Sequence, residues 1–287
     1  MLYTLEFLNN CSKIYYAGNT LYGCLNISLD REKTIYALKV IVYGRANVVL
    51  KSGKSSAFQK QIFIEETALE FAQKHLTVGN HRFNFEVKLP GNCPPSFKGE
   101  HGFIKYEVIV IIPKLFSSGK HPHEFTIISY SPLPFFEFNV NIFDYELSKY
   151  FQKCLLQFPL KIHISSTNKV TFPKNVFRTG ENIMIEVNID QNIPSGKMDF
   201  FLVQYIFYQA DNWITRLEQK EKNSVVIIRR RTSSETIYQE CIKIPDNVPT
   251  TLEYLEILKI RYFIKIVING KKFKLPIVIG DFYKTTD

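Results

Sequence analysis

The chain has 287 residues, of which 45% are apolar and 14% aromatic, and a formal net charge of +9 at pH 7. This length suits two domains that each bury a core, and the apolar content excludes a disordered chain. No stretch approaches the roughly 18 apolar residues that a membrane-spanning helix needs, so the sequence predicts a soluble protein. The amino terminus lacks the basic region and long apolar core of a signal peptide, which favours a cytoplasmic location.

The cysteines predict free thiols. They are odd in number and no two are separated by only two residues, a pattern typical of a reducing compartment. It argues against a disulfide framework and against a structural zinc site. The five positions are Cys11, Cys24, Cys93, Cys154 and Cys241.

Alternation of apolar and polar residues predicts strands at residues 2–8, 20–29 and 35–49 of the first half. Gly44 is expected to mark a bulge in the third of these strands. Residues 61–73 are ambiguous, because part of this stretch has high helix propensity. In an otherwise β chain we expect a strand followed by a loop there.

Residues 85–112 form a unit of strand, loop and strand. The first strand alternates apolar and charged residues, as a half-buried strand does. Three prolines, three glycines and an asparagine between Pro90 and Gly102 exclude regular structure in the loop. The apolar run from 103 to 112 predicts a second strand at the centre of a sheet.

The same unit recurs at residues 241–268, about 160 residues later, which is longer than any solenoid period and therefore indicates two copies of one fold. An earlier signature, Gly18-Asn19, recurs as Gly180-Glu181-Asn182 in the same order relative to the unit. The matched positions are Pro90 and Pro245, Asn92 and Asn247, Pro94 and Pro249, and Tyr106 and Tyr262.

We therefore predict an all-β protein with an amino-terminal antiparallel sandwich over residues 1–144, a junction over 145–158 and a carboxy-terminal sandwich over 159–287. The strands expected in the second half cover residues 160–165, 170–172, 182–190, 198–209, 224–230, 261–269 and 272–279.

Catalytic motifs are lacking in the sequence. The segment His121-Pro122-His123 would supply two metal ligands, but neither a cysteine nor an acidic residue stands at ligand spacing. There is no nucleophile elbow and no phosphate-binding glycine loop. Cys241 alternates with apolar residues in an expected strand and is interpreted as a packed thiol. The sequence therefore predicts a protein without enzymatic activity, cofactor or metal.

Positive charge is the remaining signal. Residues 1–144 hold 15 basic and 12 acidic side chains, and residues 145–287 hold 21 and 15, so the surplus is larger in the second half. Its densest points lead us to expect contacts with phosphate groups or anionic lipid at Arg229, Arg231, Lys271 and Lys272. The alternative interpretation is that these residues are solvated strand ends. Nucleic-acid binding is not expected, because aromatic residues do not interleave with the basic ones.

The repeated motifs resemble those of a known family. From Leu89 to Tyr106 the chain reads Leu-Pro-x-Asn-x-Pro-Pro-Ser-Phe-Lys-Gly-x-His-Gly-x-Ile-x-Tyr, preceded by Tyr-x-x-Gly-Asn-x-Leu-x-Gly from Tyr15. Together with Gly180-Glu181-Asn182-Ile183 and the strand of Tyr262, this pattern resembles the α-arrestins, the arrestin-domain-containing proteins, over nearly the whole chain. The resemblance implies two tandem seven-stranded immunoglobulin-like sandwiches, the arrestin fold.

The resemblance also implies a cytoplasmic adaptor, peripheral at the plasma membrane or endosomes, that links membrane receptors or transporters to trafficking, endocytosis or ubiquitin-ligase machinery. Family members usually carry a tail with Pro-Pro-x-Tyr motifs, which ligase WW domains bind as a polyproline II helix. The nearest match here, Pro94-Pro95-Ser96-Phe97, lacks the tyrosine hydroxyl and belongs to the structural loop. Ligase recruitment is therefore expected to be indirect.

An alternative to the adaptor is a permanent structural subunit of an endosomal sorting coat, like the arrestin-folded component of retromer. Affinity purification separates the two, because a coat subunit brings stoichiometric partners and an adaptor brings transient cargo.

Overall fold

The computed structural model describes residues 2–8, 10–53, 55–114, 117–128, 160–163, 169–172, 176–188, 197–211, 216–230, 237–268 and 271–280. None of these residues is helical, and the strands form sandwich sheets, so the all-β prediction is confirmed. The chain divides into two compact units, one made of residues 1–129 and 208–218 and the other of 130–207 and 219–287. The predicted junction at 145–158 lies outside the described residues, so the domain boundaries remain predictions.

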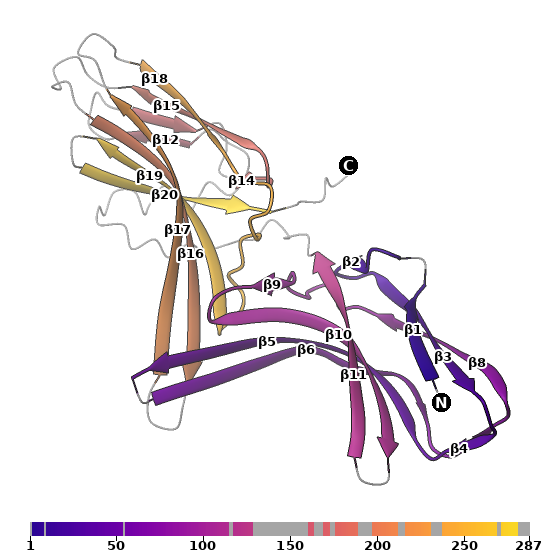
Figure 1. Ribbon diagram of the computed structural model, residues 1–287. Coiled ribbons are helices and arrows are strands. Elements are labelled where there is room, and N and C mark those ends of the chain that lie inside the picture. The colour runs from indigo at the N-terminus through magenta and orange to yellow at the C-terminus, as the bar shows by residue number, and fades with distance from the viewer. Residues whose placement is uncertain are drawn as a thin grey trace. The chain divides into compact units, whose positions relative to one another are not determined.

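The strands of the first half form three sheets (Figure 1). One sheet has the order β1-β3-β8, and the largest has the order β2-β11-β10-β5-β6 with β9 paired to β10; β4 and β7 pair with each other. Their bounds are β1 Leu2–Phe7, β2 Ile14–Tyr16, β3 Thr20–Leu29, β4 Lys33–Ile35, β5 Leu38–Ser52, β6 Ser55–Phe71, β7 Lys74–Leu76, β8 Gly79–Lys88, β9 Phe97–Lys98, β10 Gly102–Lys114 and β11 Ser117–Ile128.

The strands of the second half form two sheets, with orders β12-β13-β15-β18 and β14-β20-β19-β16-β17. Their bounds are β12 Leu160–His163, β13 Lys169–Phe172, β14 Val176–Phe177, β15 Asn182–Asn188, β16 Lys197–Asp211, β17 Arg216–Arg230, β18 Ile237–Lys243, β19 Leu258–Ile268 and β20 Lys271–Ile279.

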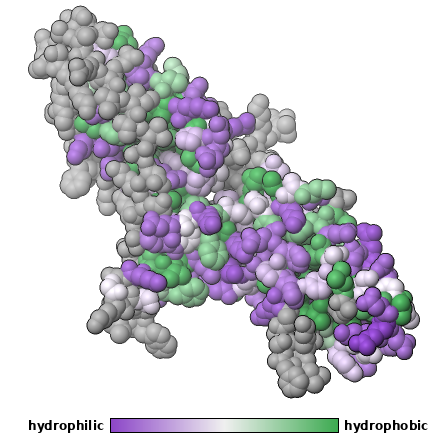
Figure 2. Space-filling view, viewed as in Figure 1, coloured by the Kyte–Doolittle hydropathy of each residue, from purple (hydrophilic) through white to green (hydrophobic). Residues whose placement is uncertain are grey.

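Period-two burial explains the two facing sheets of the first half. In β3, Leu21, Leu25 and Ile27 are fully buried, and in β10 the alternate residues from Ile104 to Val110 are buried. Side chains on alternate positions of a strand share one face, so these rows form the core between the sheets. In Figure 2 the described surface of this half is mostly hydrophilic, with apolar side chains in separate patches.

The register of β5 with β6 shifts between Gly44 and Arg45, so an irregularity is present where the bulge was predicted. The extra residue is Phe63 of β6, however, so the bulge lies in the partner strand and not in the strand of Gly44. A Cβ at Gly44 would collide with the ring of Tyr106, so the close approach of β10 requires glycine there. The ambiguous stretch from residue 61 lies in strand β6, as expected, and β6 starts earlier, at Ser55. Pairing with β5 along its whole length overrides the local helix propensity.

The repeated unit is physically the same in both halves. The hydroxyl of Tyr106 donates a hydrogen bond to the carbonyl of Pro94 at 2.7 Å. In the second copy, the hydroxyl of Tyr262 donates to the carbonyl of Pro249 at 2.6 Å. Each bond ties the proline-rich loop to the strand that follows it, so the repeated proline and tyrosine have one structural role.

A second pair of hydrogen bonds also repeats, made in each copy by the residue two positions after the accepting proline. Ser96 exchanges two hydrogen bonds with the backbone of Ile127, through its N–H at 2.8 Å and its hydroxyl at 2.9 Å. Thr251 makes the same two bonds with Ile279, at 2.7 Å and 2.9 Å. The loop that contains the near match to a WW-binding motif is thereby bonded to β11, as expected for a structural segment.

Candidate functional site

The basic residues predicted as an anion site are only partly described. Arg229 lies in β17 and Lys271 begins β20, but the structure describes only their backbones. Lys272 follows in β20 with an exposed side chain, and Arg231 lies outside the described residues. The structure therefore neither joins these four residues nor separates them, and the anion site stays a prediction.

A second candidate is the free edge of β1 (Figure 1), which the sequence analysis did not identify. β1 pairs with β3 on one side, and no described strand pairs with its other side. The N–H of Leu8 donates to the carbonyl of Tyr22 at 2.9 Å. Because hydrogen-bonded pairs alternate along an antiparallel ladder, the N–H and C=O groups of Tyr3, Leu5 and Phe7 point to the open edge.

In the second half, the equivalent edge is paired with a further strand. Its sheet β12-β13-β15-β18 contains counterparts of the sheet β1-β3-β8, since β15 and β18 follow and precede the repeated signatures as β3 and β8 do. β13 then corresponds to β1, and β12 pairs antiparallel with β13 on the side that is open in β1. The first sheet therefore has the form of the second with its outermost strand missing.

Aromatic side chains line the sandwich interior beside this edge. Tyr3 contacts His121 of β11 edge-on, with ring centroids 5.3 Å apart. Phe7 packs against Tyr15 at 6.3 Å and Phe125 at 6.1 Å. The side chains of Tyr3, Leu5 and Phe7 are only half-buried. A strand added to β1 would cover the exposed part of these side chains.

The electrostatic environment of the edge is cationic. Lys13, in the left-handed region with a φ of 56°, holds its Nζ 5.3 Å from the centroid of Phe7. Burial, followed by the charges of Lys13 and His121, lowers the pKa of His123. The Nε2 of His123 and the hydroxyl of Tyr15 are buried and have no hydrogen-bond partner within the described residues. Buried polar atoms are normally paired, so these two atoms mark a part of the sandwich interior whose polar groups the described residues do not satisfy.

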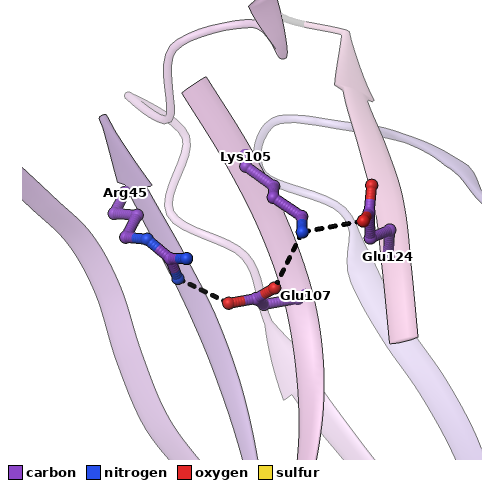
Figure 3. Close-up of polar contacts among 4 residues, drawn as sticks. All are labelled: Arg45, Lys105, Glu107 and Glu124. Atoms are coloured by element: carbon purple, nitrogen blue, oxygen red, sulfur yellow. Dashed lines mark hydrogen bonds and ion pairs between the residues drawn. The ribbon is translucent and has the colours of Figure 1, made fainter. Parts of the chain in front are cut away.

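A separate charge network lies on the other face of the large sheet (Figure 3). Glu107, which is 4% exposed, accepts hydrogen bonds from Arg45 through Oε1 and from Lys105 through Oε2, the latter at 3.3 Å. Lys105 also contacts Glu124 at 2.7 Å, and this bond is the main reason that its pKa is raised. Both carboxylate oxygens of Glu107 are occupied, so the network joins β5, β10 and β11 and leaves the buried carboxylate no free ligand atom.

The described cysteines and histidines form no catalytic arrangement. Burial raises the pKa of Cys93 to about 11, which keeps its thiol protonated at neutral pH. Cys241 is exposed on β18, where the sequence analysis expected a packed thiol, so that interpretation was wrong. Its position follows from strand alternation, because Ile242 and Tyr238 take the buried face. Among the described residues no three His, Cys, Asp or Glu side chains are grouped to hold a metal, and no helix could cross a membrane.

Two family models match the chain, one in each half. Residues 5–133 match the model of the N-terminal domain of arrestin, or S-antigen, and residues 165–282 match the model of its C-terminal domain. The structure is similar to the crystal structure of squid arrestin, with a TM-score of 0.54, 12% identity and coverage of 99% of this chain and 96% of that one. At this identity the similarity establishes the fold alone.

The curated relatives are arrestin domain-containing proteins. Arrestin domain-containing protein 1 of Mus musculus is 23% identical over 281 residues, which cover 93% of this chain and 62% of that protein. Arrestin domain-containing protein 15 of Caenorhabditis elegans is 23% identical over 225 residues, covering 71% and 58%. This chain thus spans about three fifths of the length of these relatives. With both domain models matched in order over most of its length, the chain belongs to the arrestin-domain protein family.

Proposed function

We propose that this chain is a non-catalytic cytoplasmic adaptor of the arrestin type, which binds membrane receptors or transporters as cargo and links them to trafficking, endocytosis or ubiquitin-ligase machinery at the plasma membrane or endosomes. Family membership supports the adaptor role in general. The observation that favours cargo binding by this chain is the open edge of β1. The sheet β1-β3-β8 then presents an edge that accepts a segment of cargo.

The bound segment would add an antiparallel or parallel strand to the sheet. Backbone groups of Tyr3, Leu5 and Phe7 would provide main-chain hydrogen bonds, which supply affinity without sequence preference. Selectivity would come from alternate side chains of the segment. Apolar ones would cover Tyr3 and Phe7, and an anionic one would meet Lys13.

The basic residues Arg229, Arg231, Lys271 and Lys272 are proposed as an additional contact for phosphorylated cargo tails. In a strand, Arg229 and Arg231 project to the same side and Arg230 to the other. Neutralising Arg229 and Arg231 together should weaken binding of a phosphopeptide, with an effect that shrinks at high salt, while neutralising Arg230 should matter less. Equal effects from all three positions would contradict this contact.

The test of strand addition compares two substitutions at one position. Leu5→Pro removes the N–H that points to the open edge while leaving the ladder to β3 intact, because proline is tolerated on edge strands. Leu5→Ala is the matched control, since it shortens the same side chain and keeps the N–H. Cargo tails are first identified by affinity purification of the full chain and then measured as peptides by calorimetry.

We expect Leu5→Pro to weaken tail binding at least about tenfold and Leu5→Ala to weaken it much less. Amide exchange at residues 2–8 should slow when the tail is bound. Equal losses from both substitutions, or no change in exchange, would refute strand addition. Recovery of stoichiometric coat partners without transient cargo would instead favour a permanent subunit of a sorting coat.

A further inference from the structure

The distal half of the hairpin formed by β5 and β6 has an unusual charge pattern. Residues 45–64 contain Arg45, Lys51, Lys54 and Lys60 and no acidic residue, which gives this stretch a formal charge of +4. Glu65 is the first acidic residue after it. Clustered positive charge of this kind attracts anionic surfaces, and its effect is local because salt screens exposed charges over about 10 Å.

The strand register places apolar and basic side chains on the same face of this hairpin. Val49 lies opposite Phe58, Asn47 opposite Lys60, and Arg45 opposite Ile62. Alternation puts Lys51 on that face too. We call these seven residues the outer hairpin face. The other face holds buried residues, namely Ala46, Val48, Leu50 and Ala57.

Three large apolar side chains of the outer hairpin face are open to solvent. Phe58 is 54% exposed, Ile62 46% and Val49 45%. Single exposed apolar residues are ordinary on protein surfaces, whereas neighbouring ones indicate an interaction surface. Val49 and Phe58 are direct cross-strand neighbours. Ile62 lies on the same strand and face as Phe58, with Lys60 between them on that face.

The basic residues of this face differ in whether their charged groups already contact an acidic partner. Arg45 is held by Glu107 and lies over the ring of Tyr43 at 5.2 Å, so its guanidinium is not available for a bidentate phosphate contact. Lys60 lies 5.1 Å from the centroid of the same ring. Lys51 and Lys60 are exposed and have no ion-pair partner within the described residues. Flexible lysines without an arginine fork suit a diffuse anionic surface better than a single phosphate.

From these observations we infer that the outer hairpin face docks on an anionic lipid bilayer, with Val49, Phe58 and Ile62 entering the interface and Lys51 and Lys60 contacting the headgroups. Apolar side chains flanked by lysines are the arrangement by which peripheral proteins bind the boundary between headgroups and acyl chains. Lysine stems reach along the apolar layer and keep the ammonium group in water. This inference does not depend on strand addition at β1, which involves a different sheet.

The test measures sedimentation of the full chain with vesicles of phosphatidylcholine alone and of phosphatidylcholine mixed with phosphatidylserine. We expect binding to the mixed vesicles only. Replacing Lys51 and Lys60 by alanine should weaken it about 25-fold, at about fivefold for each lysine near an anionic surface. Val49→Ser with Phe58→Ser should weaken it at least about tenfold. Ile237→Ser with Lys243→Ala, an exposed apolar and basic pair on β18, is the matched control and should change nothing.

Insertion is tested separately with Phe58→Trp, whose fluorescence should be quenched by lipids brominated on their acyl chains, relative to the parent chain with its one tryptophan. Lack of quenching would show a purely electrostatic contact and overturn the inference. So would equal losses in the control variant, or no binding of the parent chain to mixed vesicles. If the hairpin variants keep vesicle binding but lose cargo, the face docks a protein instead.

Discussion

The hydroxyl of Tyr106 should contribute more to stability than any exposed tyrosine hydroxyl, because it satisfies a buried carbonyl. Tyr106 is fully buried and donates to the carbonyl of Pro94 at 2.7 Å. Tyr106→Phe removes one oxygen and leaves almost no cavity, so the cost is that of a buried acceptor without a donor, about 1–3 kcal/mol. The thiol of Cys93 loses its hydrogen bond to the same hydroxyl, which places the expected cost in the upper part of that range.

The assay is denaturant unfolding followed by near-ultraviolet circular dichroism, with thermal unfolding as a second measure. For a domain of this size, each kcal/mol corresponds to roughly 4 °C in Tm, so we expect Tm to fall by about 4–12 °C. The control is Tyr36→Phe, which removes the hydroxyl of a tyrosine that is 72% exposed and should cost less than about 0.5 kcal/mol.

The second copy of the unit provides an internal replicate. Tyr262 donates to the carbonyl of Pro249 and accepts from the amide of Gln204 at 2.6 Å. Tyr262→Phe therefore removes two hydrogen bonds, and its cost should at least equal that of Tyr106→Phe. If both substitutions change stability no more than Tyr36→Phe does, the repeated tyrosine does not hold the loop and our interpretation of the repeat is wrong.

Three further outcomes can be measured on the first half of the chain. Gly44→Ala should destabilise it by about 1–3 kcal/mol in denaturant unfolding, because the new methyl group meets the ring of Tyr106. Arg45→Met should cost about 2 kcal/mol, since Glu107 keeps only one cation, and the double change with Glu107→Leu should recover most of this loss in a double-mutant cycle. The lowered pKa of His123 means that the unfolded chain binds the proton more readily, so stability should fall as pH drops below about 6.5, and His123→Gln should reduce that slope in pH-dependent unfolding.

Local sequence patterns predicted most strands because burial in this fold alternates residue by residue. The strand at residues 20–29 was predicted with the bounds that β3 has, and its buried residues are the apolar ones of the pattern. Residues 61–73 were harder, since their propensities favour a helix in part. Their strand conformation depends on β5, which precedes them in sequence and pairs with β6 as far as Phe71. A long-range partner decides the structure there, and no local window contains it.

The repeat was predictable and its chemistry was not. Two copies of proline, asparagine and tyrosine in the same order and at nearly the same spacing indicated two copies of one fold. The hydroxyl-to-carbonyl bonds of Tyr106 and Tyr262 depend on how the loop folds back on the next strand, about 12 residues away. The short parallel strand pairs could not be predicted either, for the same reason. In each pair, β2 with β11 and β14 with β20, the two strands are separated by most of the sequence of that half.

The open edge of β1 could not be predicted from the chain because an edge is a property of strand order. The sequence predicts the strand at residues 2–8 equally well whether one or two strands flank it. Only the pairing with β3, together with the alternation of hydrogen bonds from Leu8, assigns the free backbone groups to Tyr3, Leu5 and Phe7. The side chains that contact β1, Tyr15 and His121, come from two further segments.

The positive charge of the β5-β6 hairpin is present in the sequence, but it does not stand out when basic and acidic residues are summed over each half of the chain. Residues 1–144 hold 15 basic and 12 acidic side chains, which suggested that the surplus lay elsewhere. Without residues 45–64, the same half holds 11 basic and 12 acidic ones, so its entire positive surplus lies in that one hairpin. Screening limits the reach of exposed charges to about 10 Å, so an anionic surface responds to the charge of one face. The field that matters for docking is therefore set by which residues share a strand face, as Lys51 and Lys60 do beside Val49 and Phe58.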